Sequence, residues 1–346
     1  MRLLTCTPIN TPHRNNTMSE QNRKTTVWNH TPQLPLQSMP YWHWPPKPWA
    51  VLRWLFENFL QLSDRALFLL YSFVIAFWLM PFVPAEATVS WDWTAMVLLR
   101  NMVAVFLVVG GLHIWFHGID GQGNVMRFDA RPITGRKNAL FLFGYQTWDN
   151  MFHTLVYGVP IASGFEIAVR WAYANDWTTP LSFSDSPVWF VLLFPLLTLL
   201  QGIHFYLIHR LIHWPPLYRH VHSVHHRNVN VGPWSGLSMH PVEHLFYFSS
   251  LLIFFVLPAH PVHMMFLLHW QLLGAPTGHS GYEAVFAKNK ARILIGGFFH
   301  QLHHRYYECN YGSPEFPLDK WFGTYHDGTE EMTAVIRDRK RRMHAK

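Results

Sequence analysis

Four long, uninterrupted apolar stretches dominate the first two thirds of the chain. They cover residues 66–83, 95–116, 151–173 and 187–208. Each is long enough for a helix that crosses a membrane, which needs about 20 apolar residues. Ahead of them, residues 49–62 space apolar and tryptophan side chains at helical intervals, which predicts an amphipathic helix on the bilayer surface. The pattern therefore predicts an all-α, multi-span helical membrane protein.

A fifth apolar stretch, residues 245–273, is interrupted by Pro258 and Pro261 and also carries three histidines. Two halves of about 13 residues are each too short to cross the bilayer, so we expect a re-entrant hairpin that returns the chain to the side it came from. A single kinked span is the alternative. It would place the C-terminal histidines on the opposite side of the membrane from the other histidine-rich segments.

Lysine and arginine predict the orientation of the spans. The connections 84–94 and 174–186 contain none, whereas 117–150 contains four, 209–244 three and 279–346 eleven. Since basic loops stay on the cytoplasmic side, both termini and every histidine-rich segment are expected there. The C-terminus shows no KDEL-type or dilysine signal, which favours a bacterial inner membrane over the endoplasmic reticulum.

Composition narrows the possible chemistry. Of the 346 residues, 50% are hydrophobic and only 14% charged, and the 24 histidines outnumber the 20 aspartates and glutamates. Cys6 and Cys309 form no Cys-x-x-Cys pair, so any metal must be held by histidine. The net charge is +7, and the lysines and arginines gather in the loops and the tail beside the predicted spans. Because this distribution points to a membrane, we expect no nucleic-acid partner.

Three groups of histidines have the spacing of metal ligands. In chain order they read His-x3-His, His-x2-His-His and His-x2-His-His, formed by His209, His213, His222, His225, His226, His300, His303 and His304. Spacings of three and four put the rings of each group on one face of a helix. Eight imidazoles are more than one ion usually takes, so the sequence predicts two metal ions. Imidazole suits zinc, copper, iron and nickel, but no carboxylate base accompanies these groups, which favours iron and dioxygen chemistry over a zinc hydrolase.

The histidine motifs resemble those of a known family, the fatty acid hydroxylase and sterol desaturase superfamily of integral-membrane di-iron enzymes. HRLIH, HSVHH and HQLHH occur with the flanking motifs LYRH, PWS, MHPVE, GHSGYE and NYGSPEFPLDKWFGT over residues 190–326. The resemblance implies that the eight histidines hold two irons and that His240 and His279 complete the ligand set. His204 and His244 depart from the usual pattern of the family. Each is a further ligand, a partner of a ligand or a structural residue.

The resemblance also implies a reaction. Dioxygen and two electrons would oxidise an unactivated C–H bond of a lipid substrate to an alcohol or an alkene. The chain has no Gly-x-Gly-x-x-Gly fingerprint and no fused cytochrome b5 segment, so we expect a separate cytochrome b5-like or ferredoxin-like electron donor. Trp234, Tyr218, Phe298 and Phe299 either line the lipid pocket or pack at the membrane interface.

Two other functions stay open from the residues alone. A metal transporter would need a relay of ligands within the spans, and a haem-binding electron-transfer protein would need axial histidines on separate spans. The basic tail, 331–346, docks an acidic carrier or, as we favour, contacts anionic lipid heads.

The expected organisation is a disordered leader (1–48), an interfacial helix with three spans (49–186), a fatty acid hydroxylase-like catalytic domain (187–330) and this tail.

Overall fold

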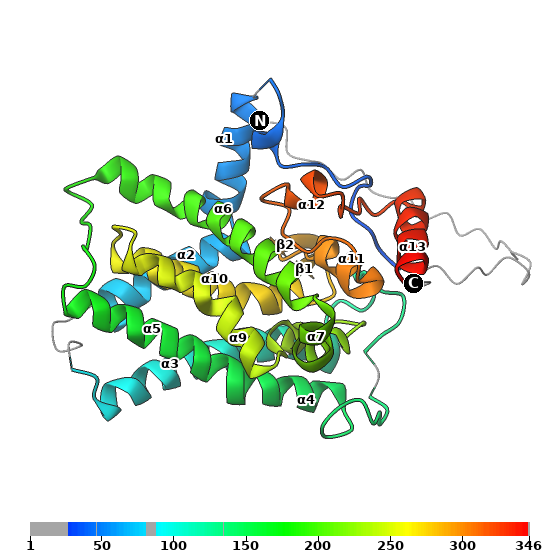
Figure 1. Ribbon diagram of the computed structural model, residues 1–346, viewed down its shortest axis with the longest axis horizontal. Coiled ribbons are helices and arrows are strands. Elements are labelled where there is room, and N and C mark those ends of the chain that lie inside the picture. Colours follow the sequence, from blue (N-terminus) through cyan, green and yellow to red (C-terminus); the bar gives the residue numbers. More distant parts are fainter. Residues whose placement is uncertain (1–26, 46, 81–87, 134, 345–346) are drawn as a thin grey trace, which may run out of the picture.

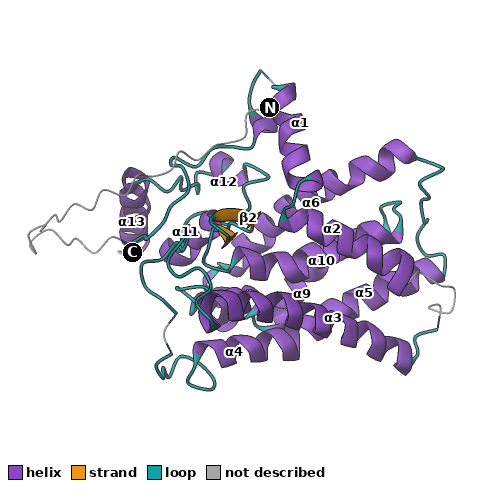
Figure 2. Ribbon diagram, turned by 180° about the vertical axis from the view of Figure 1, so that it is seen from behind, coloured by secondary structure: helices purple, strands orange, loops and turns teal. Residues whose placement is uncertain are grey.

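The computed structural model describes residues 27–45, 47–80, 88–133 and 135–344 (Figure 1). Long helices run side by side through most of the molecule, and shorter segments gather at one end, on the right in Figure 1. We name this end the cap and define it as residues 213–240 and 279–344. The predicted all-α architecture is confirmed, with one small addition in the cap (Figure 2). That addition is an antiparallel pair, β1 (Ala284–Ala287) and β2 (Lys290–Leu294), which the hydrophobic pattern did not indicate.

Three helices in the described part of the chain are long and apolar enough to cross a membrane. They are Trp91–Gly118, Gln146–Ala174 and Pro187–Ile212, of 28, 29 and 26 residues. The first consists of α3 (Trp91–His113) and a π-helical turn. The second consists of α4 (Gln146–Phe152), a π-helical turn and α5 (Val159–Ala174), and the third is α6 (Pro187–Ile212). Leu107 and Val188 are 67% and 70% exposed on their outer faces, as side chains that face lipid would be.

The first expected span, 66–83, is shorter than the sequence predicted. The Ser63 hydroxyl caps α2 (Asp64–Val74) by accepting the backbone N–H of Ala66, and a π-helical turn, Ile75–Leu79, ends the helix. Its 11 and 5 residues extend only about 24 Å, against a hydrocarbon core of about 30 Å. The rest of the predicted stretch includes residues 81–83, which lie outside the described residues.

The segment before α2 lies across the direction of the long helices (Figures 1 and 2). It consists of α1 (Pro48–Leu55) and a π-helical turn, Phe56–Leu60, and leaves Trp49 and Leu60 83% and 76% exposed. This arrangement fits the interfacial position expected for residues 49–62.

Residues 27–45, expected within a disordered leader, instead pack along the cap. Trp28 contacts Phe298 edge-on with ring centroids 5.0 Å apart. Tyr41 and Trp42 both donate hydrogen bonds to the backbone carbonyl of Glu315, each at 2.8 Å. Aromatic contacts and paired donors hold this segment, and its low apolar periodicity in the sequence gave no sign of either. The earlier part of the predicted leader, residues 1–26, lies outside the described residues.

The stretch expected as a re-entrant hairpin forms two helices whose connecting turn lies far from the cap. α9 (Pro241–Phe248) continues as a seven-residue 3-10 helix, Ser249–Phe255, and α10 (Pro261–Gly278) returns. The carbonyl of Ala259 accepts the Tyr173 hydroxyl at 3.0 Å, so the turn touches the end of α5. The two arms extend about 26 and 27 Å, longer than two 13-residue halves, because the 3-10 segment rises faster and α10 has 18 residues.

The remaining helices, most of them short, lie in the cap or along it. They are 3-10 Pro40–Trp42, α7 (Pro215–Leu217), π-helical η8 (Tyr218–His222), α8 (Ser223–His226), 3-10 Pro233–Leu237, α11 (Phe298–Tyr306), α12 (Leu318–Trp321) and α13 (Glu330–His344).

Between the long helices, the buried Glu166 carboxylate contacts the Arg100 guanidinium and accepts the Asn101 side-chain N–H at 2.9 Å. Arg170, four residues on, lies 4.0 Å away as its spacing suggested, so this buried charge is well compensated.

Candidate metal centre

The first histidine pair is carried by the end of α6. This helix runs past the expected stretch 187–208 to Ile212, and Pro215 prevents it from continuing. His209 is buried and His213 follows one turn later, so both rings point into the cap from the same face of the helix.

The other two motifs contribute to two different groups. His222, His226 and His303 join the α6 pair, whereas His225 and His304 turn to a second group. From the spacing alone, all three rings of each motif are expected on one face of a helix. Neighbouring residues on a helix point about 100° apart, so a motif ending in His-His presents one ring to each side.

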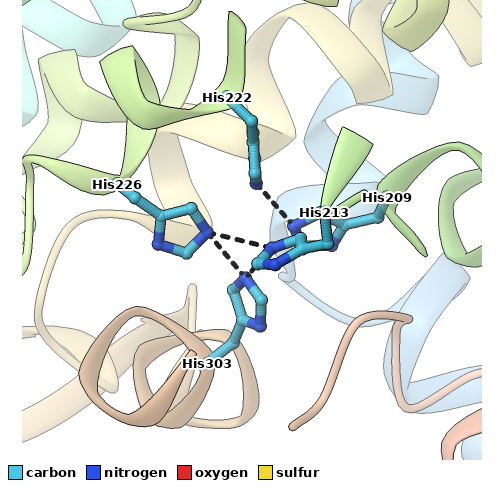
Figure 3. A group of neighbouring side chains, drawn as sticks. All are labelled: His209, His213, His222, His226 and His303. Carbon is cyan, nitrogen blue, oxygen red and sulfur yellow. Dashed lines mark hydrogen bonds between the residues drawn. The ribbon is translucent and has the colours of Figure 1, made fainter. Parts of the chain in front are cut away.

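Five imidazoles from three parts of the chain meet in the first group, the five-histidine group (Figure 3). Its members are His209, His213, His222, His226 and His303. One nitrogen from each lies within 4.8 Å of all the others. His213 Nε2 is 3.2 Å from both His226 Nε2 and His303 Nε2, and the last two are 3.0 Å apart. Nitrogens so close together form a cage of the size that one metal ion fills.

The second group, the four-histidine group, has the same character. It consists of His225, His279, His300 and His304. His304 Nε2 lies 3.1 Å from the Nε2 atoms of both His225 and His300. His279, a ligand that the resemblance implied, is thus brought to the site. The two groups adjoin, since the His226 and His304 rings lie 4.9 Å apart between centroids.

The tautomers of these rings leave lone pairs facing one another. His209 and His303 each donate Nδ1–H to a backbone carbonyl at 2.6 Å, and His222 donates its Nδ1–H to Glu243 at 2.7 Å. Burial and nearby imidazoles hold the pKa of His222 and His303 well below its usual range, so these rings are neutral at pH 7. A neutral imidazole that donates from Nδ1 has only a lone pair at Nε2. The 3.1 Å between His209 Nε2 and His222 Nε2 therefore contains no shared proton, and a cation is the partner that both nitrogens fit.

Two rings of the four-histidine group are oriented in the same way. The Ser235 hydroxyl donates to the Gly232 carbonyl at 2.7 Å, so it accepts the Nδ1–H of His279 at 3.0 Å. His225 donates from Nδ1 to the Ser238 carbonyl at 3.3 Å, and burial lowers its pKa to about 4. Both Nε2 atoms are left free to bind a metal.

Glu243 is a functional residue that sequence reasoning missed. Its side chain is 3% exposed, and one oxygen fixes the His222 ring through the 2.7 Å hydrogen bond. A carboxylate behind a ligating histidine fixes the tautomer and makes the ligating nitrogen more basic. The signal was present in the MHPVE motif, but the carboxylate stands 21 residues from His222, and only the fold brings the two together.

Asp319 orders the loop that holds His209. Its two oxygens accept the backbone N–H of Tyr311 at 2.9 Å and of Gly312 at 2.7 Å. Tyr311 then presents its carbonyl to His209 Nδ1. The NYGSPEFPLDKWFGT motif therefore supports the site through a buried carboxylate and backbone hydrogen bonds.

His240, implied as a ligand by the resemblance, lies outside both groups. It precedes α9, and its Nδ1 accepts the Val242 backbone N–H at 3.2 Å, so the ring caps the helix. His204 is also outside them, with Nε2 2.9 Å from the Ser249 hydroxyl. His244 is fully buried, and neither ring nitrogen has a hydrogen-bond partner within the described part of the chain.

A cavity of about 440 Å³ opens beside the two groups, between α6, α9, α10 and α11. Its walls include His209, His279 and Phe205, and also Phe298 and Phe299, two of the four aromatic residues considered for a pocket. The other two are elsewhere. Trp234 is 3% exposed and packs in the core, and the Tyr218 ring lies beside the five-histidine group rather than along the cavity wall.

A helical bundle with helices long enough to cross a membrane, two histidine groups at one end and an adjoining cavity is the arrangement expected of a membrane-bound metal protein. Comparison with known families adds to this picture. Residues 194–324 match the family model described as fatty acid hydroxylase. This region belongs to the fatty acid hydroxylase and sterol desaturase superfamily, which confirms the resemblance seen in the motifs. No solved structure matches the chain significantly.

Three curated relatives illustrate the range of the superfamily. The Delta(7)-sterol 5(6)-desaturase of Saccharomyces cerevisiae is 31% identical over 39% of this chain and 36% of its own length. Methylsterol monooxygenase 1 of Gallus gallus is 26% identical over 52% and 63%, and a very-long-chain aldehyde decarbonylase of Oryza sativa subsp. indica is 32% identical over 42% and 55%. The chain thus spans less than two thirds of the length of these relatives. All three come from eukaryotes, so they give no support to the expected bacterial membrane.

Proposed function

We propose that this protein is a membrane-bound di-iron oxygenase that hydroxylates or desaturates a C–H bond of a lipid, using dioxygen and two electrons from a separate carrier. One observation carries the proposal: nine mostly buried histidines form two adjoining groups, with unprotonated nitrogens converging beside a cavity. The names of the relatives, which include a sterol desaturase and a methylsterol monooxygenase, support lipid oxidation. Compact closed groups favour a catalytic centre over a transport relay, which would string ligands along the spans.

Each part of the site and of the cavity has a separate role in the proposed reaction. The five- and four-histidine groups would hold one iron each, and iron bound there supplies the activation of dioxygen. Glu243 keeps the His222 proton on Nδ1, and the Tyr311 carbonyl does the same for His209. Phe205 and Phe298 on the cavity wall exclude water from the reacting carbon. The basic loops beside the cap support a cytoplasmic site.

Metal analysis and lipid mass spectrometry test the proposal together. Purified protein is expected to contain two iron atoms per chain. Cells that express it should accumulate a lipid that has gained one oxygen atom or lost two hydrogen atoms, and only when dioxygen is present. A purified protein that retains zinc but no iron, or a lipid profile identical to that of cells without the protein, would contradict the proposal.

We also infer that α13 receives the electron donor. Ile336 of α13 is 1% exposed and packs against the cap, so the helix is anchored beside the site. The Lys340 ammonium stands 4.7 Å from the centroid of the Tyr307 ring, and that ring lies 4.9 Å from the His226 ring. One aromatic side chain therefore separates the basic surface from the five-histidine group.

Charge reversal at Lys340 is expected to weaken turnover driven by an acidic ferredoxin. Lys340→Glu should raise the KM for the ferredoxin about two- to fivefold, because an exposed charge pair contributes little more than this. Turnover driven by dithionite should stay unchanged. Lys290→Glu, on the exposed strand β2, is the matched control. An equal rise in KM for both variants would argue against this docking surface.

A further inference from the structure

Five polar atoms of residues that line the cavity have no hydrogen-bond partner in the part of the chain that the structure describes. Two of them, Glu243 Oε2 and His300 Nδ1, belong to the metal centre, and the other three lie apart from it. These three are Oε1 of Gln201, Oε1 of Gln271 and Oγ of Ser313. Gln201 is 8% exposed and Gln271 is 2% exposed, so water has little access to either amide. Leaving a buried acceptor unpaired is costly, and native proteins pair nearly all of them. These three atoms therefore mark a place where a ligand supplies the missing hydrogen bonds.

The Gln271 amide is held in one orientation. Its Nε2 donates to the Tyr247 carbonyl at 2.7 Å, and the Tyr247 hydroxyl donates back to the Gln271 carbonyl at 3.1 Å. With Nε2 already engaged, the amide presents only its oxygen as an unpaired atom. A group that is solely an acceptor, such as an ether or a carboxylate, cannot satisfy this oxygen.

The residues that carry the three oxygens lie at a similar distance from the cap. Gln201 stands eight residues before His209 on α6, and Gln271 stands eight residues before His279 on α10. Eight helical residues span about 12 Å. The two helices both lead toward the cap, and Ser313 Oγ lies 3.0 Å from where a Cβ on Gly202 would stand. The two glutamines thus lie about 12 Å from the histidines, measured along either helix.

The charges around the cavity disfavour an anionic head group. Five carboxylates line it, those of Asp64, Glu243, Glu283, Glu315 and Asp319. Only two side chains that are cationic at pH 7 do so, Arg65 and Lys320. Arg65 is paired with the Glu315 carboxylate, and Lys320 donates to the Ser38 hydroxyl. Carboxyl groups thus outnumber cations among the described lining residues, and a fatty acid carboxylate would find only the Lys320 ammonium without a carboxylate partner.

We propose that the cavity selects a lipid alcohol, whose hydroxyl group is anchored by Gln201 and Gln271. The single hydroxyl hydrogen is shared between the two glutamine oxygens in a three-centre hydrogen bond, and the hydroxyl oxygen accepts from Ser313. This anchor holds the reacting carbon about 12 Å away along the cavity, at the histidine groups. The inference rests on the proposed function and adds its substrate class, with the two glutamines as specificity-determining residues.

Binding to the purified, detergent-solubilised protein tests the anchor without requiring turnover. The probes are cholesterol and hexadecan-1-ol, each paired with its own methyl ether, and hexadecanoic acid. At least one alcohol should bind about tenfold more tightly than its ether and than the acid, because only the alcohol satisfies the buried oxygens. Equal binding of alcohol and ether, tighter binding of the acid, or no binding of either alcohol would overturn the proposal.

Two variants complete the test. Gln201→Leu should bring the ratio of alcohol to ether affinity close to one, whereas Gln122→Leu should preserve the ratio. Gln122 is an equally buried glutamine, 8% exposed, that bonds to backbone carbonyls away from the cavity. His303→Ala is measured in the same assay. Its alcohol preference should persist while its iron content falls, because the anchor lies apart from the histidine groups. If the original protein prefers the alcohol but holds no iron, the di-iron proposal fails and the anchor stands. An altered preference in Gln122→Leu would count against the anchor.

Discussion

Replacing His303 with alanine is expected to abolish lipid oxidation and to remove most of the iron held by the five-histidine group. His303 Nε2 lies 3.0 and 3.2 Å from the Nε2 atoms of His226 and His213, so its loss opens the centre of the cage. Changing even a partner behind a ligand costs about 10- to 100-fold in metal affinity or activity, so losing a ligand should lower turnover by at least about 100-fold. Iron per chain and conversion of the cellular lipid are the measurements.

His240→Ala is the matched control for this experiment. The sequence motif implies that both histidines are ligands, but the structure places His240 outside the two groups, as a cap of α9. Its removal should cost about 1 kcal/mol of stability and leave the iron content unchanged. Full iron in His303→Ala, or an equal loss of iron in both variants, would show that the groups do not define the metal ligands.

Replacing Glu243 is expected to have the second largest effect. Glu243→Gln keeps a hydrogen-bond acceptor beside His222 Nδ1 but removes the carboxyl group that ionises to balance a bound cation, so iron affinity should fall about tenfold. Glu243→Ala also leaves the buried Nδ1–H unpaired and should lower it about 100-fold. Competition with a chelator measures the affinity, and turnover should fall in parallel.

Glu283→Gln serves as the comparison. Glu283 belongs to another matched motif, GHSGYE, and its carboxylate pairs with His30 rather than with a histidine of either group. Iron affinity should therefore stay within about twofold of the original protein, since no ligand loses its partner. If Glu283→Gln weakened iron binding as much as Glu243→Gln, the effect of Glu243 would be one of general charge rather than of His222.

Local geometry explains which features of this protein the sequence predicted well. The length of a membrane-crossing helix is a property of consecutive residues, and three of the four predicted stretches form helices of that length. The spacing of His209 and His213 is likewise local, since a helix alone brings residues four apart onto one face. The first stretch forms a shorter helix than predicted, because the Ser63 cap and a π-helical turn fix its two ends. Neither feature can be detected from hydropathy.

Contacts between distant residues explain what the sequence left undecided. The division of nine histidines into groups of five and four depends on how α6, α8 and α11 converge, so the choice of His279 over His240 could not be read from motif order. Glu243, whose carboxylate orients His222 from 21 residues away, became visible only in the folded chain.

The sequence by itself thus determined a helical protein with stretches long enough to cross a membrane and eight histidines at ligand spacing, because hydrophobic length and helical periodicity act within a single segment. Only the tertiary structure decided which nitrogens share a site, which carboxylate supports them and where a cavity with unpaired glutamine oxygens lies. The physical reason is that each of these features requires side chains from several helices, whose relative positions depend on packing across the whole bundle.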